Sequence, residues 1–480
     1  MTKHLLYILA LILTLAACTS SPHDARQTDE AAPMYPDYAD VTIPVNIAPL
    51  NFLLRDDVSR VCVYINNVEF ANQRGNEVVF DLEAWRTLLA ANQGKTLEVQ
   101  IVAEDADGWK AYKPFRWTVT ADRVDPYLTY RLIEPDYEVY NNLVLQERCV
   151  ENFKVRNFAD YGMVGNQCMN CHTYAHQEAG MSMFYLRGQD GGAILNDKGK
   201  LTKLNLKRDD MVSGSVYFGF SPSDRYVVFS TNVIIPAFHS LGSKRMEVFD
   251  TKSDVYVADL THHVFIDSPL LADSTRLETF PTFSPDGKYI YYCTAHRLDS
   301  LGGLTSLKYS LCRIPFDEET GKIGTDVDTI YNAQAAGKSV CHPRISPDGQ
   351  FLVYTVADYG TFPIWHRESD LQMMNLSTGE VSEMPKVNSA MSDTYHSWSS
   401  NSRWLAFASK RDDGLYGKVY YTHIDKKGVC SKPFVLPQAH PTFYDNSLKS
   451  FNAPEQGNGR LPFSVTDVQK VLSASAIEFR

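Results

Sequence analysis

The residues with the clearest chemical potential form the run Cys168-Met169-Asn170-Cys171-His172, in a chain of 480 residues. Cys-x-x-Cys-His is the attachment signature of c-type haem. Two thiols at this separation add to the two vinyl groups of the porphyrin, and the following imidazole is held against the iron as the proximal ligand. The spacing therefore predicts that Cys168 and Cys171 bind haem c covalently, with His172 on the iron.

Three other interpretations of this motif stay open. A zinc site needs two further ligands, which Cys149 or His176 could supply, although the chain has no second Cys-x-x-Cys. A thioredoxin-like redox pair requires a βαβ context, whereas the flanking residues suggest a short irregular connector. A structural disulfide is the third alternative.

The iron's opposite ligand must come from elsewhere in the chain. On a helix, His176 would project from the same face as His172, so it could reach the far side of the porphyrin only after a chain reversal. Met183 and Met181 follow Gly180, where the chain could turn, and a thioether opposite the imidazole would raise the reduction potential. We expect Met183 first and Met181 second as distal ligands. Packing in a core and an open sixth position are the alternatives.

The N-terminus carries a targeting pattern. Lys3 and His4 precede an apolar run over residues 5–13 that is too short to span a bilayer comfortably, as in the h-region of a signal peptide. Small residues then lead into Cys18 and resemble the lipobox of bacterial lipoproteins, in which the cysteine is lipidated. This pattern predicts a signal peptide over 1–17, lipidation at Cys18 and a flexible polar tether over 18–40.

Such an anchor would hold the protein on a membrane with its body in the periplasm, where covalent haem attachment takes place. The compartment and the haem motif thus agree with each other. We expect a periplasmic redox or envelope protein as partner. Nucleic acid is excluded as a partner by charge, because 57 Asp and Glu outnumber 46 Lys and Arg and leave a net charge of −11.

The elements that must position the motif are predicted to be mainly β. Apolar residues alternate over 41–123, and Asn66-Asn67 and Asp107-Gly108 mark turns between these runs, which indicates a small β-sandwich with a short helix over 82–91. Residues 124–183 are expected to form a connector that carries the haem motif.

The C-terminal half contains a repeat in which Ser-Pro-Asp-Gly or a variant joins two apolar strands. One such unit cannot bury both of its faces, so several must stack in a closed ring, and the spacing suits the blades of a β-propeller. The four copies begin at Phe220, Phe283, Ile345 and Trp398, and a degenerate blade is expected near 184–206.

These repeats resemble the Ser-Pro-Asp-Gly β-propellers of the TolB-like and oligopeptidase-associated type over residues 184–437. The resemblance implies a propeller of five or six blades over 184–445, with a closing segment over 446–480. Oligopeptidase relatives attach a hydrolase domain, but the chain has no Gly-x-Ser-x-Gly motif, so a hydrolase is not expected.

The stretch from Tyr140 to Gly192, which ends in Arg187-Gly188-Gln189-Asp190-Gly191-Gly192, is similar to a group of Bacteroidetes lipoproteins. These join a short sandwich, a single Cys-x-x-Cys-His connector and a TolB-like propeller, and are often labelled cytochrome c or cytochrome-biogenesis related. The resemblance implies a membrane-anchored c-type cytochrome that transfers electrons or senses redox state. The alternative is a non-enzymatic binding or scaffold propeller whose motif holds zinc or a disulfide.

The remaining histidines and cysteines are given structural roles. Cys341-His342 and His262-His263 are expected at blade ends or in loops, and His396 is expected to be structural although it could line a central channel. Four cysteines are expected to be small buried hydrophobic residues in or beside strands, namely Cys62, Cys293, Cys312 and Cys430.

Overall fold

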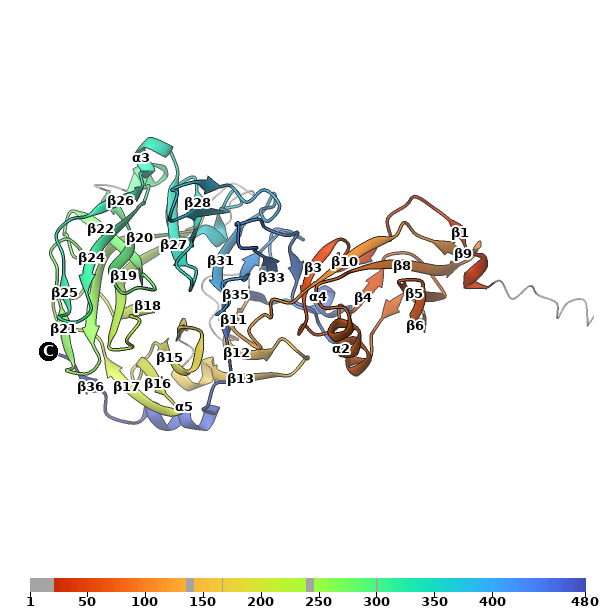
Figure 1. Ribbon diagram of the computed structural model, residues 1–480. Coiled ribbons are helices and arrows are strands. Elements are labelled where there is room, and N and C mark those ends of the chain that lie inside the picture. The colour runs from red at the N-terminus through yellow and green to blue at the C-terminus, as the bar shows by residue number, and fades with distance from the viewer. Residues whose placement is uncertain (1–20, 135–141, 166, 239–245, 299–300) are drawn as a thin grey trace, which may run out of the picture. The chain divides into compact units, whose positions relative to one another are not determined.

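A computed structural model of the chain describes residues 21–134, 142–165, 167–238, 246–298 and 301–480 (Figure 1). The chain divides into two compact units. The first unit comprises Met1–Ile43, Pro49–Thr120 and Pro437–Asn446, and the second unit comprises Pro44–Ala48, Ala121–Leu436 and Ser447–Arg480. Both are built mainly of strands, which confirms the predicted fold class. Among the described residues, no helix is long and apolar enough to cross a membrane.

The first unit contains two sheets and a helix. The larger sheet consists of β1 (Arg26–Gln27), β3 (Val41–Pro44), β5 (Arg60–Ile65), β6 (Val68–Arg74), β8 (Thr96–Asp105), β9 (Gly108–Ala111) and β10 (Phe115–Thr120). The smaller sheet consists of β2 (Met34–Tyr35), β4 (Phe52–Leu54) and β7 (Glu77–Val78). The short helices are η1 (Pro22–Asp24) and α4 (Phe443–Asn446).

Helix α2 (Leu82–Ala91) occupies the predicted residues of the first unit. The side chain of Asp81 caps it by accepting hydrogen bonds from two backbone amides of the first turn. Trp85 on this helix lies 5.4 Å, ring centre to ring centre, from Trp117 of β10, and 5.4 Å from Phe80. Phe80 also lies 6.1 Å from Phe52 of β4, so one aromatic cluster joins the helix to both sheets.

The prediction of a flexible tether over 18–40 is wrong for the described residues of that segment. β1 pairs with β9, and β2 pairs with β4, so residues from Arg26 onwards belong to the sheets of the first unit. Met34 in β2 is buried. The polar composition of this segment hid the pairing, because main-chain hydrogen bonds rather than apolar side chains hold β1. Cys18 and the signal peptide lie outside the described residues.

The second unit contains six sheets within the described residues, each forming one blade. From the inner strand outwards, blade 1 is β14 (Met169–Ala175), β15 (Glu178–Leu186), β16 (Gly192–Asp197) and β17 (Lys200–Asn205), with β36 (Ile477–Glu478) at its edge. Blade 2 is β18 (Ser215–Phe220), β19 (Tyr226–Phe238), β20 (Met246–Asp259) and β21 (Val264–Ile266). Blade 3 is β22 (Arg276–Phe283), β23 (Tyr289–His296) and β24 (Ser310–Asp317), with β25 (Lys322–Ile323) and β26 (Asp328–Tyr331).

The other three blades follow the same plan. Blade 4 is β27 (Ser339–Ile345), β28 (Phe351–Ala357), β29 (Asp370–Asn375) and β30 (Val381–Ser382). Blade 5 is β31 (Asp393–Trp398), β32 (Trp404–Ser409), β33 (Lys418–His423) and β34 (Phe434–Val435). Blade 6 is β35 (Ser450–Gly457), β11 (Tyr127–Ile133), β12 (Val144–Cys149) and β13 (Val155–Asp160). Connecting helices are η2 (Tyr161–Val164), η3 (Leu301–Ser306), α3 (Ala333–Ala336), η4 (Pro363–Trp365) and α5 (Val465–Leu472).

The ring of blades closes between distant parts of the chain. Each inner strand contacts the inner strand of the next blade, and β35 contacts β14. Blade 6 pairs β35, near the C-terminus, with β11, near the start of the second unit. Hydrogen bonds between chain ends therefore close the propeller, which explains the role of the segment over 446–480.

This closure corrects the expected connector over 124–183. Instead of an irregular link, its described part supplies three strands of blade 6 and the two innermost strands of blade 1. The Cys-x-x-Cys-His motif thus lies at β14, the inner strand of blade 1. Residues 437–445, expected in the propeller, and residue 446, expected in the closing segment, belong to the first unit.

A serine holds each repeat hairpin together. Ser346 Oγ donates a hydrogen bond to Asp348 Oδ1 (2.6 Å) and accepts one from the backbone amide of Phe351 (2.9 Å). Ser284 makes the same two bonds in blade 3, and Ser399 makes them in blade 5 with Asn401 in place of Asp. The repeat thus encodes a side-chain clamp for the turn.

Candidate functional site

A β-bulge interrupts all six inner strands at the same level of the propeller. Each inner strand shifts register against its neighbour there and has one residue with positive φ. An extra residue in one strand reorients its side chain. The six residues are Cys171 (φ 55°), Tyr217 (55°), Phe280 (50°), His342 (53°), Tyr395 (46°) and Ala453 (48°), and we call them the bulge ring.

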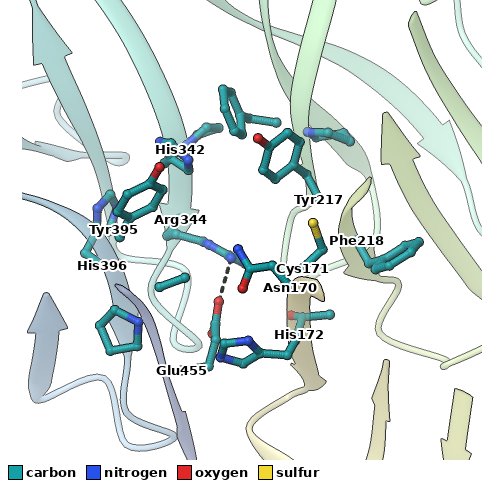
Figure 2. A pocket seen from close by; sticks show the side chains of 16 residues that line it. Asn170, Cys171, His172, Tyr217, Phe218, His342, Arg344, Tyr395, His396 and Glu455 are labelled. Carbon is teal, nitrogen blue, oxygen red and sulfur yellow. Dashed lines mark hydrogen bonds and ion pairs between the residues drawn. The ribbon is translucent and has the colours of Figure 1, made fainter. Parts of the chain in front are cut away.

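The bulge ring borders a small internal cavity on the propeller axis. All six members line this channel, which has a volume of about 60 Å³. His172 and His396 line it as well (Figure 2). Arg344 Nη2 lies 2.7 Å from Glu455 Oε1 at its wall, so the two charges compensate each other. A volume of this kind has room for a few water molecules.

Aromatic rings fill much of the bulge ring. The imidazole of His342 lies 3.9 Å from Phe280 and 4.7 Å from Tyr395, measured between ring centres. Tyr217 lies 4.3 Å from Phe280. Burial lowers the pKa of His342 well below its ordinary value, so this imidazole is neutral. These packed rings narrow the channel along the propeller axis.

A wider cavity opens on one side of the bulge ring, and we call it the cup. Its volume is about 250 Å³, and Cys171, Tyr217 and Tyr395 line both the cup and the channel. A second opening of about 400 Å³ shares Thr173, Arg344 and Glu455 with the other side of the channel. The cup, the channel inside the bulge ring and the second opening therefore follow one another along the propeller axis.

Both cysteines of the motif line the cup. Cys168 and Cys171 are half-buried free thiols. Arg131 Nη1 lies 3.9 Å from Cys168 Sγ. Burial raises the pKa of Cys171 to about 11, so its thiol is protonated at neutral pH. The cup thus presents two thiols on one wall that can be oxidised or covalently modified.

His172 is a buried neutral imidazole. Its side chain lines the channel, and neither ring nitrogen makes a hydrogen bond of good geometry with a described residue, although the backbone of Thr129 and of Ala453 lies near enough to act on its pKa. Burial lowers its pKa to about 4, which leaves a lone pair available at neutral pH. The ring centre of Phe158 lies 6.5 Å from that of the imidazole. Burying an imidazole without hydrogen-bond partners is costly, and His342 in the same channel has two unpartnered ring nitrogens as well.

These residues fit haem c in their chemistry. Two thiols on a cavity wall and an unpartnered neutral imidazole are the donors that covalent attachment and iron ligation require. The backbone differs from expectation, because the motif lies on a bulged strand and not on a helical turn. Within the described ranges, no group of three or more His, Cys, Asp or Glu side chains is arranged to hold a metal ion.

The distal ligand candidates lie away from the cup. Met183 on β15 is completely buried and packs in the core that includes Phe218 and Phe229, and Met181 packs against the same core. His176 lies in the turn after β14, and its Nε2 is 3.4 Å from Asp224 Oδ1. The structure thus supports the packing alternative for both methionines.

The structure also places the histidines and cysteines for which the sequence predicts structural roles. His342 lies on inner strand β27 in the bulge ring, so the blade-end expectation for it is wrong. His396 lines the channel and is also structural, since its Nε2 lies 3.0 Å from the Val353 carbonyl oxygen. His262 and His263 follow β20 in a turn as expected. The four cysteines expected to be buried are buried and free.

No family model matches the chain, and no curated protein matches it. Solved structures with similar folds are distant. An oligogalacturonate lyase in complex with manganese is 12% identical over 65% of this chain and 73% of that chain, with a TM-score of 0.36. Hydrazine synthase from Kuenenia stuttgartiensis is 10% identical over 69% of this chain and 46% of that chain, with a TM-score of 0.43. A prolyl endopeptidase is 11% identical over 64% and 42%, with a TM-score of 0.32.

Proposed function

We propose that this protein is a membrane-anchored periplasmic c-type cytochrome whose haem is attached to the propeller at Cys168 and Cys171. The observation that carries the proposal is the pairing of the Cys-x-x-Cys-His spacing with its location. Both thiols line one cavity, and the imidazole that follows them is buried, neutral and unpartnered. A covalently bound haem supplies a one-electron redox centre.

The chain's own residues would hold the cofactor and control its surroundings. Cys171 on inner strand β14 and Cys168 directly before it would hold the haem covalently, and His172 on the same strand would offer a lone pair to the iron. Apolar and aromatic walls of the cup exclude water, which affects reduction potential. These include Ile133, Val216, Ile234, Phe362 and Ile364. Electron transfer or redox sensing would then occur at the cup's open side, where a periplasmic partner can dock.

The membrane anchor is the second part of the proposal. Lipidation at Cys18 would keep the protein on a membrane, because no helix in the described part of the chain could span one. Cys18→Ser protein should therefore appear in the soluble periplasmic fraction, whereas the wild type stays with the membranes. Equal membrane retention of the two would contradict lipidation.

A haem-stained denaturing gel tests covalent attachment. Protein made with a cytochrome c maturation system should retain haem through denaturation, and the Cys168→Ala/Cys171→Ala variant should lose it. Cys149→Ala is the matched control, because Cys149 is also a half-buried free thiol but lies outside the cup. A wild type that carries zinc or a Cys168–Cys171 disulfide and no haem would favour the alternative of a binding or scaffold propeller.

A further inference from the structure

The cup contains a buried lysine without an anionic partner. Lys410 follows the last residue of β32 and is only 6% exposed. Among the described residues, no carboxylate lies within ion-pair distance of its Nζ. Its ammonium instead lies 4.5 Å from the ring centre of Trp365, and both side chains line the cup. A cation–π contact compensates only part of the cost of burying a charge.

Nearby carboxylates are committed elsewhere. Asp393 accepts a hydrogen bond from Arg411 at 2.8 Å, and Asp412 pairs with Lys418 at 2.6 Å. Asp413 accepts hydrogen bonds from two backbone amides of its own turn and forms no ion pair with Lys410, although its charge acts on Lys410 and raises the pKa of that ammonium. Burial lowers the pKa of Lys410 to about 8, so the ammonium form still predominates at neutral pH. Among the described residues that line the cup, no carboxylate therefore forms an ion pair with this positive charge.

The other charged residues of the cup reinforce this sign. Arg131 and Arg187 line the cup, and the Nε of Arg131 is buried without a hydrogen-bond partner. Glu134 is the one acidic side chain among the described lining residues, and its Oε1 already accepts a hydrogen bond from Asn142. Three cations thus face one carboxylate, which favours an anion in the cavity.

The shape of the cup restricts what that anion can be. Tyr217, Tyr395, Phe362 and Trp365 provide aromatic walls, and the volume of about 250 Å³ suits a compact organic group. An inorganic anion would leave these walls in contact with water. A carboxylate on an apolar or aromatic body would satisfy both the ammonium and the walls.

We propose that the cup is a carboxylate-binding site in which Lys410 pairs with the carboxylate of an organic ligand. Two sources supply this chemistry, namely a propionate of the haem attached at Cys168 and Cys171, or a free organic acid. Only the haem source rests on the proposed function. The site itself follows from Lys410, Trp365 and the cup, whichever group enters it.

Benzoate and benzamide are matched probes, because they share a ring and differ in charge. With haem-free wild-type protein, made without a maturation system, titration calorimetry should show benzoate binding roughly tenfold or more tightly than benzamide. Lys410→Met should abolish that preference, and Lys410→Arg should retain it. Lys252→Met, which removes the same charge at a different cavity, should change nothing.

Equal affinity of the wild type for the two probes, or a benzoate preference that survives in Lys410→Met, would overturn the site. The comparison of probes on the wild type keeps the test decisive if Lys410→Met fails to fold. Haem-loaded wild-type protein then separates the sources. Loss of benzoate binding on loading, together with a reduction potential of the loaded protein that shifts in Lys410→Met and not in Lys410→Arg, identifies a propionate as the occupant, and unchanged binding identifies a free acid. Protein that never acquires haem would contradict the proposed function while leaving the benzoate result intact.

Discussion

His366 Nε2 lies 3.0 Å from Glu247 Oε1, and both side chains are almost completely buried. The other ring nitrogen, Nδ1, lies 3.1 Å from Glu368 Oε1, and Tyr359 donates a hydrogen bond to Glu247 Oε2 at 2.7 Å. Because His366 directly follows η4 and Glu247 belongs to β20, this network ties the segment that carries Trp365 to blade 2. It therefore positions one wall of the cup.

The His366 network should make stability depend on pH. Burial alone would lower the pKa of His366, but the hydrogen bonds and charges of Glu247 and Glu368 outweigh it and raise the pKa to about 9, from 6.5. The stabilisation is thus complete below pH 6.5 and is lost as the pH rises through 9. We expect His366→Gln to lower the free energy of unfolding at pH 6 by about 3 kcal/mol and to flatten its decline between pH 6.5 and 9. An unchanged pH profile in denaturant titrations would refute this.

The hairpin serines should each contribute measurable stability. Ser346→Ala removes both bonds of the clamp in blade 4 and leaves the Phe351 amide unsatisfied, so we expect a loss of about 1–2 kcal/mol in denaturant unfolding. Ser274→Ala is the control, because Ser274 is exposed and its side chain makes no hydrogen bond within the described ranges. If the two variants are equally stable, the clamp has no energetic role.

Met183 should behave as a core residue. We expect Met183→Ala to cost about 2–5 kcal/mol, whereas Met183→Leu, which conserves volume, should cost less than about 1.5 kcal/mol. Neither change should alter the haem absorption spectrum or the rate of carbon monoxide binding to the ferrous protein. Faster carbon monoxide binding in both variants would restore Met183 as a distal ligand.

Local patterns were enough to predict the blades but not their closure. The serine turns mark hairpins of blades 2 to 5, because each clamp lies within six residues of sequence. Blade 6 carries no such mark, since its inner strand β35 pairs with β11 more than 300 residues away. Long-range pairing of this kind leaves no periodic signal in the sequence. The sequence therefore predicts a connector where the structure has strands of blade 6.

Four members of the bulge ring share a fixed position in the sequence repeat. Tyr217, Phe280, His342 and Tyr395 each lie four residues before the serine or equivalent of their repeat, at Ser221, Ser284, Ser346 and Ser399. Aligning the repeats would have brought three aromatic residues and a histidine to one position. The bulge itself could not be foreseen, because positive φ at non-glycine residues depends on the surrounding strands. Lys410 had no sequence signal, since its burial follows from packing against Trp365.

The most direct test of the account is the mass of the tryptic peptide 157–187, which contains Cys168, Cys171 and no other cysteine. Protein matured with haem, then denatured and alkylated, should yield this peptide with the mass of one haem added and with neither thiol alkylated. The peptides that contain Cys62, Cys149, Cys293, Cys312, Cys341 and Cys430 should be alkylated in the same digest, which controls for access of the reagent. A peptide 157–187 that carries two alkyl groups and no haem would contradict the central claim.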